Sequence, residues 1–314
     1  MKPTIYYSPA CLDHKGFPGF AEKPARLASL VSVFSDAGFN IVAPPPAEPE
    51  WLRRIHTPAY ITTIEDISRK NLLAATFANV TSPHVQWYTR VSPGSYNAAL
   101  HAAGAVCRAA EDTMSGKTMR TFCPVRPPGH HAGPDRGEGF CLFNNIAAGA
   151  FHALENGAGK VAIIDFDRHH ANGTQDIIAA SGTKNVLLVS SYQEGCKYNH
   201  NEMGGRISDT LLTLPLKAGS TWSEIGKRYA DKVIPALYDF QPDLILISAG
   251  FDAHKDDPLT NLKMESMDYF RLTRMLVDAA NDLCGGRIVS ALEGGYEIDA
   301  LAECVGYHLQ ALRR

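Results

Sequence analysis

The sequence lacks closely spaced cysteines, an excess of basic charge and long apolar runs. Its 7 cysteines are an odd number, are scattered and form no C-x-x-C motif, so we interpret them as reduced, mostly buried thiols of a cytoplasmic protein. The 30 Lys and Arg residues against 33 Asp and Glu residues give a net charge of −3, which does not indicate nucleic acid as a partner. No apolar run approaches the roughly 20 residues that span a membrane, and the N-terminus lacks a signal-peptide pattern.

The sequence does contain an alternation of short apolar strands and helices. Four runs rich in branched residues predict strands over Lys160–Asp165, Asn185–Ser190, Asp243–Ser248 and Arg287–Leu292. Apolar residues at helical spacing predict helices over Ala98–Ala110, Trp222–Phe240 and Met267–Leu283. Strands that alternate with helices favour a parallel sheet with helices on both faces. No repeat or long linker divides the chain, so we expect a single α/β domain over residues 1–314.

Polar clusters follow three of the predicted strands. They are Asp165–His170, Ser248–Asp257 and Glu293–Tyr296. Ligand sites of open parallel sheets lie at the carboxyl ends of the strands. The three clusters are therefore expected to meet at one edge of the sheet.

The first cluster, Asp-Phe-Asp-Arg-His-His, has the residue types of a metal site. Asp165, Asp167 and His169 share one side of an extended chain, and carboxylate and imidazole are suitable zinc ligands. A salt-bridge cluster is the alternative interpretation of this pattern. Asp252 is the best-placed third ligand, and its alternative role is to cap the next helix. We expect His254 and the run 255–257 to form a loop with a solvated face.

Two further motifs carry candidate catalytic groups. In Arg-Pro-Pro-Gly-His-His, His130 and His131 have the chemistry of a general base and acid, although they could equally bind metal. Gly294 and Gly295 allow a tight turn that presents Tyr296, whose phenol could donate to an oxyanion or be a structural tyrosine. Cys141 has no activating neighbours, so we expect it in the core.

Taken together, these motifs resemble the arginase/deacetylase superfamily, and in particular histone deacetylases and their bacterial class II-type relatives. The motifs, in chain order, are EKPARL (22–27), HTPAYI (56–61), SPGSY (92–96), RPPGHHAG (126–133), GFCLFNN (139–145), DFDRHHANGTQD (165–176), SAGFDAHKDDPL (248–259) and LEGGY (292–296). The resemblance implies a single α/β domain with an eight-stranded parallel sheet. It also implies a zinc-dependent amide hydrolase that removes an acetyl group from an amine such as acetyl-lysine.

The resemblance assigns roles to individual positions. It implies that Asp167, His169 and Asp252 bind one zinc per chain. His130 and His131 become the catalytic pair, Tyr296 polarises the carbonyl and Phe140 lines the acyl-lysine channel. A structural potassium is implied as well, with ligands from Asp165, Asp167, His169, Ser190 and Ser191.

The two histidines are implied to have different partners. Asp165 would back His130 and Asn172 would back His131, and a carboxylate stabilises an imidazolium while an amide does not. We therefore expect His131 to act as general base and then acid, and His130 as an electrostatic helper that stays protonated.

The sequence departs from the family pattern around the channel. The loop 14–21 and the stretch 192–199 differ from relatives, which leaves Tyr198 as the candidate for the second channel wall. Polyamine-selective relatives can place an acid where this chain has Leu259, which favours acyl-lysine or a neutral amide over an acetylpolyamine. A dinuclear manganese ureohydrolase is disfavoured because the chain has His170, Ala171 and Asn172 where more acids are needed. A catalytically silent binding module of the same fold is the remaining alternative.

Overall fold

The sheet is the central layer of the fold. In the computed structural model, which describes residues 2–16, 19–36, 38–74, 82–86, 88–198 and 204–313, nine strands form one sheet in the order β2-β1-β3-β9-β8-β4-β5-β7-β6. The strands are β1 (Thr4–Tyr6), β2 (Asn40–Val42), β3 (Arg120–Cys123), β4 (Val161–Asp165), β5 (Val186–Gln193), β6 (Gly205–Ser208), β7 (Leu211–Leu216), β8 (Leu244–Ala249) and β9 (Ile288–Leu292).

Eight of the described strands run parallel, as the resemblance implied, and a ninth is added at one edge. β6 pairs antiparallel with β7 through the short turn at 209–210, with Ser208 opposite Leu211. A tight turn of this length can only return the chain antiparallel. The residues of β6 are mostly exposed, so β6 has no apolar run that would mark it as a strand in the sequence.

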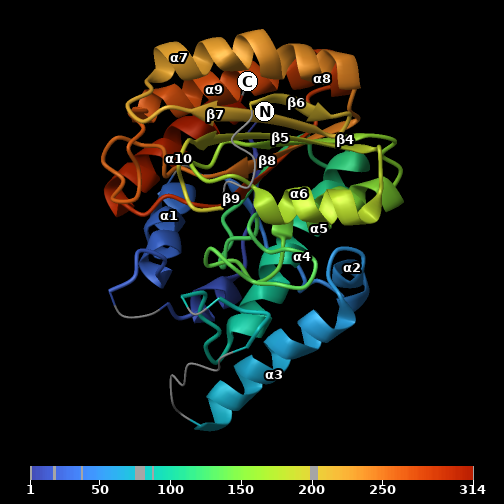
Figure 1. The fold of residues 1–314 in the computed structure, drawn as a ribbon, viewed down its shortest axis with the longest axis vertical. Coiled ribbons are helices and arrows are strands. Elements are labelled where there is room, and N and C mark those ends of the chain that lie inside the picture. The colour runs from blue at the N-terminus through green and yellow to red at the C-terminus, as the bar shows by residue number, and fades with distance from the viewer. Residues whose placement is uncertain are drawn as a thin grey trace.

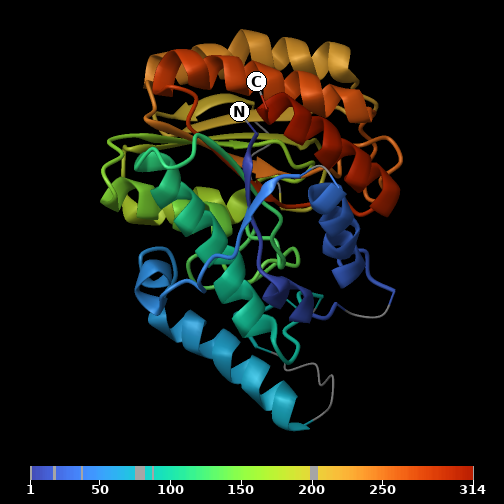
Figure 2. The same cartoon turned by 180° about the vertical axis from the view of Figure 1, so that it is seen from behind.

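Helices cover both faces of the sheet (Figure 1). They are α1 (Pro24–Asp36), α2 (Pro49–Arg53), α3 (Pro58–Ala74), α4 (Ser95–Met114), α5 (Asn145–Glu155), α6 (Asn172–Ser181), α7 (Trp222–Arg228), α8 (Ile234–Phe240), α9 (Ser266–Cys284) and α10 (Ile298–Leu312), with the short helices η1 (Pro9–Asp13) and η2 (Tyr229–Val233). In Figure 1, α7 to α9 lie above the sheet, α5 and α6 lie below it, and α3 projects away from it. α1 packs beside α10, as Figure 2 shows from behind.

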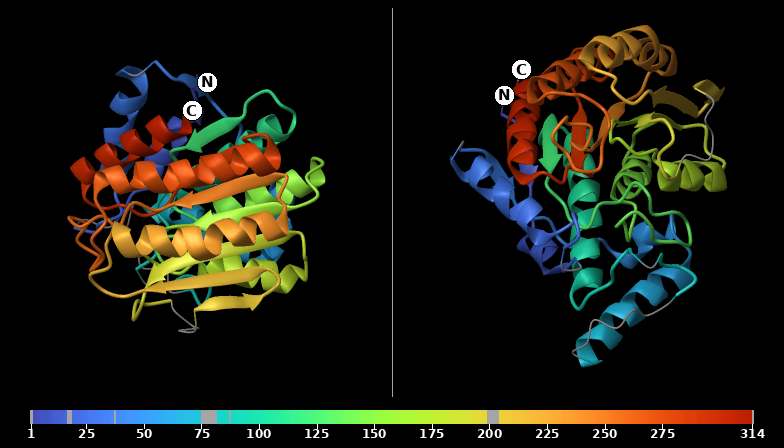
Figure 3. Two further views of the ribbon diagram at one scale, coloured as in Figure 1. Left: turned by 90° about the horizontal axis from the view of Figure 1, so that it is seen from above. Right: turned by 60° about the vertical axis from the view of Figure 1, so that its left-hand side comes forward.

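The core is divided by the alternation of side chains along the strands. In β4, Ala162 and Ile164 pack in the cluster under α8 to α10, whereas Val161 and Ile163 pack against α4 and α5. Successive side chains of a strand point to opposite faces, so a strand covered on both faces is apolar throughout. The four predicted central strands are confirmed for this reason, and Figure 3 shows α8 and α9 lying over them.

The predicted helix over Trp222–Phe240 contains one irregular turn. The α-helical pattern changes at η2, which is a π-helical turn between α7 and α8. Pro235 has no N–H to donate to the residue four positions earlier, and a π turn is one way to accommodate such a break. No helix among the described residues is both long and apolar enough to cross a membrane.

Candidate active site

The carboxyl ends of β4, β8 and β9 lie side by side and deliver the predicted site residues to one edge of the sheet. Asp165 at the end of β4 stands opposite Ser248 of β8, and β8 pairs in parallel with β9. The loops that leave these three strands carry Asp167 and His169, then Asp252, and then Tyr296. Strand register thus brings together the three polar clusters, as predicted.

Asp167, His169 and Asp252 form a group that could hold a metal ion. Their ligand atoms all lie within 4.8 Å of one another. His169 Nδ1 lies 2.9 Å from Asp167 Oδ1 and 3.0 Å from Asp252 Oδ2. Apart from this contact, Asp252 Oδ2 is buried without a hydrogen-bond partner among the described residues. A buried, unsatisfied carboxylate oxygen is costly, so the group fits a divalent cation.

Glycines make room for this group. A Cβ on Gly294 would lie 2.5 Å from Asp167 Oδ2 and 2.6 Å from Asp252 Oδ2. The N–H of Gly294 instead donates to Asp167 Oδ2 at 2.8 Å. A Cβ on Gly250 would lie 2.1 Å from the same oxygen. The loops after β8 and β9 can therefore close on the carboxylates only because these positions lack side chains.

The charged side chains of the metal-ligand group shift one another's pKa values. Burial raises the pKa of Asp252, and the negative charge of Asp167 raises it further. Burial alone would lower the pKa of His169, but the hydrogen bond to Asp167 and the contact with Asp252 raise it to about 9. Two buried carboxylates thus draw a proton onto the imidazole. A metal cation would take over this neutralising role.

The rings of His130 and His131 are in contact, tilted by 44° with centroids 4.0 Å apart, but they have different partners. His130 Nδ1 lies 3.0 Å from Asp165 Oδ2, and His131 Nδ1 lies 2.6 Å from Asn172 Oδ1. Burial alone would lower the pKa of His130, but the carboxylates of Asp165 and Asp167 raise it well above its usual value. Burial and the positive charge of His130 hold the pKa of His131 well below its usual value. The two adjacent rings are therefore expected to differ in protonation.

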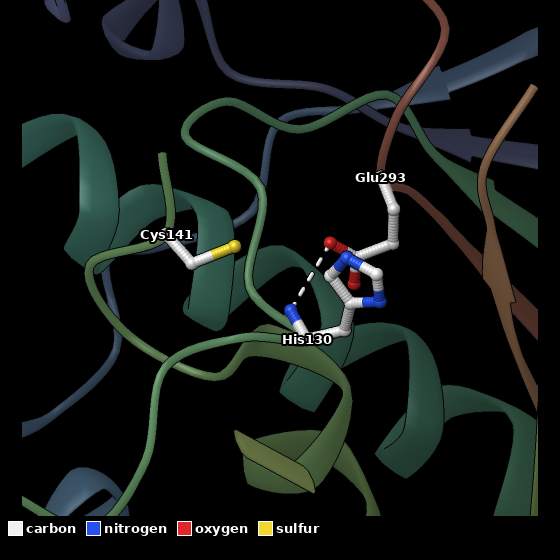
Figure 4. A group of neighbouring side chains, drawn as sticks. All are labelled: His130, Cys141 and Glu293. Atoms are coloured by element: carbon white, nitrogen blue, oxygen red, sulfur yellow. Dashed lines mark hydrogen bonds between the residues drawn. The ribbon is translucent and has the colours of Figure 1, made fainter. Parts of the chain in front are cut away.

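Glu293 fixes the loop that carries the histidine pair, a role that sequence reasoning did not assign. Its Oε2 accepts hydrogen bonds from Gly129 N at 2.7 Å and from His130 N at 3.2 Å. Burial raises the pKa of Glu293 to about 7. Figure 4 shows its carboxylate beside His130, with the Cys141 thiol directed toward them.

The three residues of Figure 4 are close enough to suggest a second metal group. However, the Cys141 thiol donates to the Gly139 carbonyl at 3.4 Å, and burial raises its pKa well above the usual value. His130 Nδ1 is occupied by Asp165, and Glu293 Oε2 is occupied by backbone N–H groups. We interpret this group as structural, and the expectation that Cys141 lies in the core is confirmed.

Tyr296 lies beside the metal-ligand group and is held from two sides. Its backbone N–H donates to Asp257 Oδ2 at 2.6 Å, and the Arg26 guanidinium lies 4.8 Å from its ring centroid. Gly295, before it, has a φ of 115°, a conformation that L side chains rarely adopt. Burial raises the pKa of Tyr296 well above its usual value, so the phenol stays protonated and can act as a donor.

A cavity of about 340 Å³ leads to the two catalytic candidates His131 and Tyr296. Its walls are formed by Phe20, Tyr88, Gly139, Phe140, His169, Lys197, Tyr198 and Leu259. Phe140 lies 5.9 Å from the Tyr296 ring, and Tyr198 lies 4.2 Å from the His131 ring. The three residues predicted to line the channel, Phe140, Tyr198 and Leu259, thus lie around one cavity.

Two residues expected in a solvated loop are buried instead. His254 and Asp257 are 4% and 5% exposed, whereas Lys255 and Asp256 are exposed as predicted. Asp257 is buried because its carboxylate satisfies the N–H groups of Leu259, at 2.9 Å, and Tyr296. The prediction was wrong for His254 and Asp257, because residues that alternate with charged neighbours resemble a surface pattern.

Glu138 is another contributor that the sequence motifs did not single out. Its Oε1 accepts a hydrogen bond from Asn172 Nδ2 at 2.6 Å, so it stands directly behind the partner of His131.

The predicted potassium ligands Ser190 and Ser191 lie on β5, which pairs with β4. Ser190 stands opposite Asp165, and Ser191 Oγ donates to the Asp165 carbonyl at 3.2 Å. The potassium itself stays a prediction. Phe17, Pro18 and Asn199, which belong to the two loops expected to differ from relatives, lie outside the described residues.

Comparisons with known proteins agree with the fold and with the site. Residues 20–312 match the histone deacetylase domain family. Over 100% of its length, the chain is 31% identical to a probable deacetylase of Archaeoglobus fulgidus and covers 89% of that protein. It is 34% identical to a histone deacetylase-like amidohydrolase of Pseudomonas aeruginosa, with 92% of this chain and 74% of that protein covered.

A longer relative and a solved structure extend the comparison. The chain is 35% identical, over 99% of its length, to Type-2 histone deacetylase 2 of Dictyostelium discoideum, but it spans only 21% of that protein. The crystal structure of the HDA15 HD domain superposes with a TM-score of 0.88 at 30% identity, covering 99% of this chain and 90% of that one.

Proposed function

Because the chain belongs to the histone deacetylase family, we propose that it is a zinc-dependent deacetylase acting on acetyl-lysine or a related acetylated amine. One observation carries the proposal. Three metal-ligand side chains lie together, and one of them, His169, lines a cavity with aromatic walls beside the His131 imidazole and the Tyr296 phenol. This is the arrangement that hydrolysis of a linear amide requires, and a long, narrow acyl-amine side chain fits such walls.

The ligand chemistry favours zinc among divalent metals. Two carboxylates and one imidazole provide three protein ligands, the number typical of catalytic zinc sites, which leave one position open. Bound zinc would supply Lewis acidity, which polarises an acyl oxygen and acidifies water. Asp167, His169 and Asp252 are the residues that would hold it, and within the described ranges Asp252 Oδ2 has no partner besides His169.

The residues around the ligand group have separate roles in the proposed hydrolysis. His131, with its lowered pKa, is neutral and can take a proton from the attacking water and return it to the leaving amine. His130, held by Asp165, keeps a positive charge beside it. Tyr296 donates a hydrogen bond to the acyl oxygen as negative charge develops there.

The assignment of His131 as the base predicts the pH dependence of a charge variant. Asn172→Asp adds a negative charge beside His131, which raises its pKa, so His131 is protonated up to a higher pH. The acidic limb of the kcat/KM profile should then move to higher pH. Because Asn172 Nδ2 lies 2.6 Å from Glu138 Oε1, the comparison of wild type with Asn172→Asp is repeated in Glu138→Gln protein, which avoids two facing carboxylates. An acidic limb that stays in place, or moves to lower pH, would rule out His131 as the titrating base.

Acetyl-lysine is favoured over an acetylpolyamine as the substrate. Among the described residues that line the channel, none is acidic, and the one lysine or arginine is Lys197, whose ammonium lies 4.2 Å from the Tyr88 ring centroid. A cationic polyamine tail would meet a like charge here, and Leu259 gives it no acid to pair with.

Substrate competition tests this preference. We expect kcat/KM for an acetyl-lysine peptide to exceed that for an acetylated polyamine by about tenfold, the equivalent of roughly 1.4 kcal/mol. Lys197→Glu should narrow the difference in kcat/KM between the two substrates, because the new carboxylate attracts the polyamine cation that Lys197 repels. Added salt should weaken this effect of the substitution. A wild-type preference for the polyamine would support the acetylpolyamine amidohydrolase alternative. Absence of hydrolysis for all acetylated amines in zinc-loaded protein would support the silent-module alternative.

A further inference from the structure

Glu138 is buried, 5% exposed, and lies directly behind the partner of His131. Its Oε1 accepts hydrogen bonds from Asn172 Nδ2 at 2.6 Å and from Arg136 Nε at 2.9 Å. Its Oε2 accepts from Gln86 Nε2 at 2.6 Å. The donors come from three segments of the chain, so the carboxylate is fixed in position and its negative charge is compensated by Arg136.

The carboxylate determines which way the Asn172 amide faces. An ionised carboxylate only accepts hydrogen bonds, so the side of Asn172 that meets Glu138 has to be the NH₂ group. The amide oxygen is then the group that meets His131 Nδ1, at 2.6 Å. An amide oxygen also only accepts, so His131 Nδ1 has to carry the hydrogen. The remaining nitrogen, Nε2, is left with a free lone pair.

We propose that Glu138 is a positioning residue that selects the tautomer of His131 through the Asn172 amide, and so makes Nε2 the basic nitrogen. This inference rests on the proposed function, in which His131 takes a proton from water. An asparagine partner alone does not specify the tautomer, because its amide can present either end to the imidazole. The carboxylate of Glu138, on the side of Asn172 away from His131, accepts from the NH₂ group and so fixes the orientation of the amide.

Removal of the carboxylate would favour the opposite orientation. Arg136 Nε and Asn172 Nδ2 share Glu138 Oε1 as their acceptor. Without Glu138, the guanidinium N–H and the amide NH₂ would face each other, and both are hydrogen-bond donors. Rotation of the amide would let its oxygen accept from Arg136 and would turn its NH₂ toward His131. The imidazole would then carry its hydrogen on Nε2 and could not act as a base from that nitrogen.

Steady-state kinetics of zinc-loaded variants tests the proposal. Glu138→Met, which removes the acceptor at similar length, should lower kcat about tenfold with little change in KM, because a hydrogen bond to a charged group that fixes the amide is lost. Glu138→Gln keeps one acceptor oxygen and should lose less. In an Asn172→Asp background the effect of Glu138→Gln on kcat should have the opposite sign. The substitution should raise kcat there, because it replaces a carboxylate that repels the new aspartate by an amide that can donate a hydrogen bond to it.

A second readout does not depend on catalysis. Two-bond ¹H–¹⁵N correlation spectra of histidine-labelled protein, with and without zinc, report which ring nitrogen of His131 carries the hydrogen. Wild type should show Nδ1–H, and Glu138→Met and Glu138→Gln should show a rising share of Nε2–H. The proposal is overturned if His131 keeps the Nδ1–H form in both variants, or if Glu138→Gln lowers kcat equally in the Asn172 and Asn172→Asp backgrounds. Wild-type protein without any deacetylase activity would refute the proposed function, and the spectra would still decide the tautomer.

Discussion

Asp252→Ala should abolish both zinc binding and deacetylation, with kcat/KM reduced by at least about three orders of magnitude, since several kcal/mol of metal catalysis is lost. The reason is that Asp252 contributes one of three ligands, and among the described residues its Oδ2 pairs only with His169, which is itself a ligand. Metal analysis of the purified protein and initial rates on an acetyl-lysine peptide measure the two losses. The matched control is Asp256→Ala, a nearby carboxylate that is 62% exposed, which should keep zinc and activity.

Thermal unfolding separates loss of the metal from loss of the fold. Zinc that binds only the folded wild type should stabilise it by about 2.7 kcal/mol when free zinc exceeds the dissociation constant a hundredfold. Asp252→Ala should unfold cooperatively but show no such increase. A variant that retains one zinc per chain, or wild-type protein that carries two transition-metal ions, would contradict the assigned ligand set.

Tyr296→Phe should lower kcat by about two to three orders of magnitude while KM, zinc content and the fold remain similar. Removal of one donor to a developing oxyanion costs about this much. The ring itself would stay in place, because its contacts with Arg26 and Phe140 do not involve the hydroxyl. Steady-state kinetics on an acetyl-lysine peptide and far-UV circular dichroism provide the measurements.

The same chemical change at another tyrosine provides the control. Tyr198→Phe also removes a hydroxyl from the channel, but the hydrogen-bond partners of that hydroxyl are Gln86, at 3.4 Å, and Tyr88. Its kcat should fall by no more than a few-fold. If Tyr296→Phe behaves like Tyr198→Phe, the Tyr296 hydroxyl is structural.

The sequence predicts those parts of the molecule that depend on local pattern. Apolar runs such as Val161–Asp165 mark the central strands because both faces of the sheet are covered. Polar residues directly after such runs, such as Asp167 and Asp252, mark the ligand edge because parallel strands end together. The antiparallel strand β6 is not predictable in this way, since its short, exposed segment forms through a turn rather than through burial.

Contacts between distant segments account for what the sequence does not reveal. Glu293 clamps the loop of His130, Asp257 holds Tyr296, and Glu138 orients Asn172. Glu138 and Asp257 follow charged residues, which is a context that is also common at protein surfaces. Only the folded arrangement shows that backbone and amide N–H groups surround them. For Glu293, the position immediately after an apolar strand was the one available signal.

A zinc titration of chelated protein is the most direct test of the account. Protein stripped of metal should have no deacetylase activity on an acetyl-lysine peptide, and added zinc should restore activity in proportion until one equivalent per chain is bound. Activity that persists after complete removal of metal, or that needs two equivalents to reach its maximum, would contradict the proposal of a single catalytic zinc held by Asp167, His169 and Asp252.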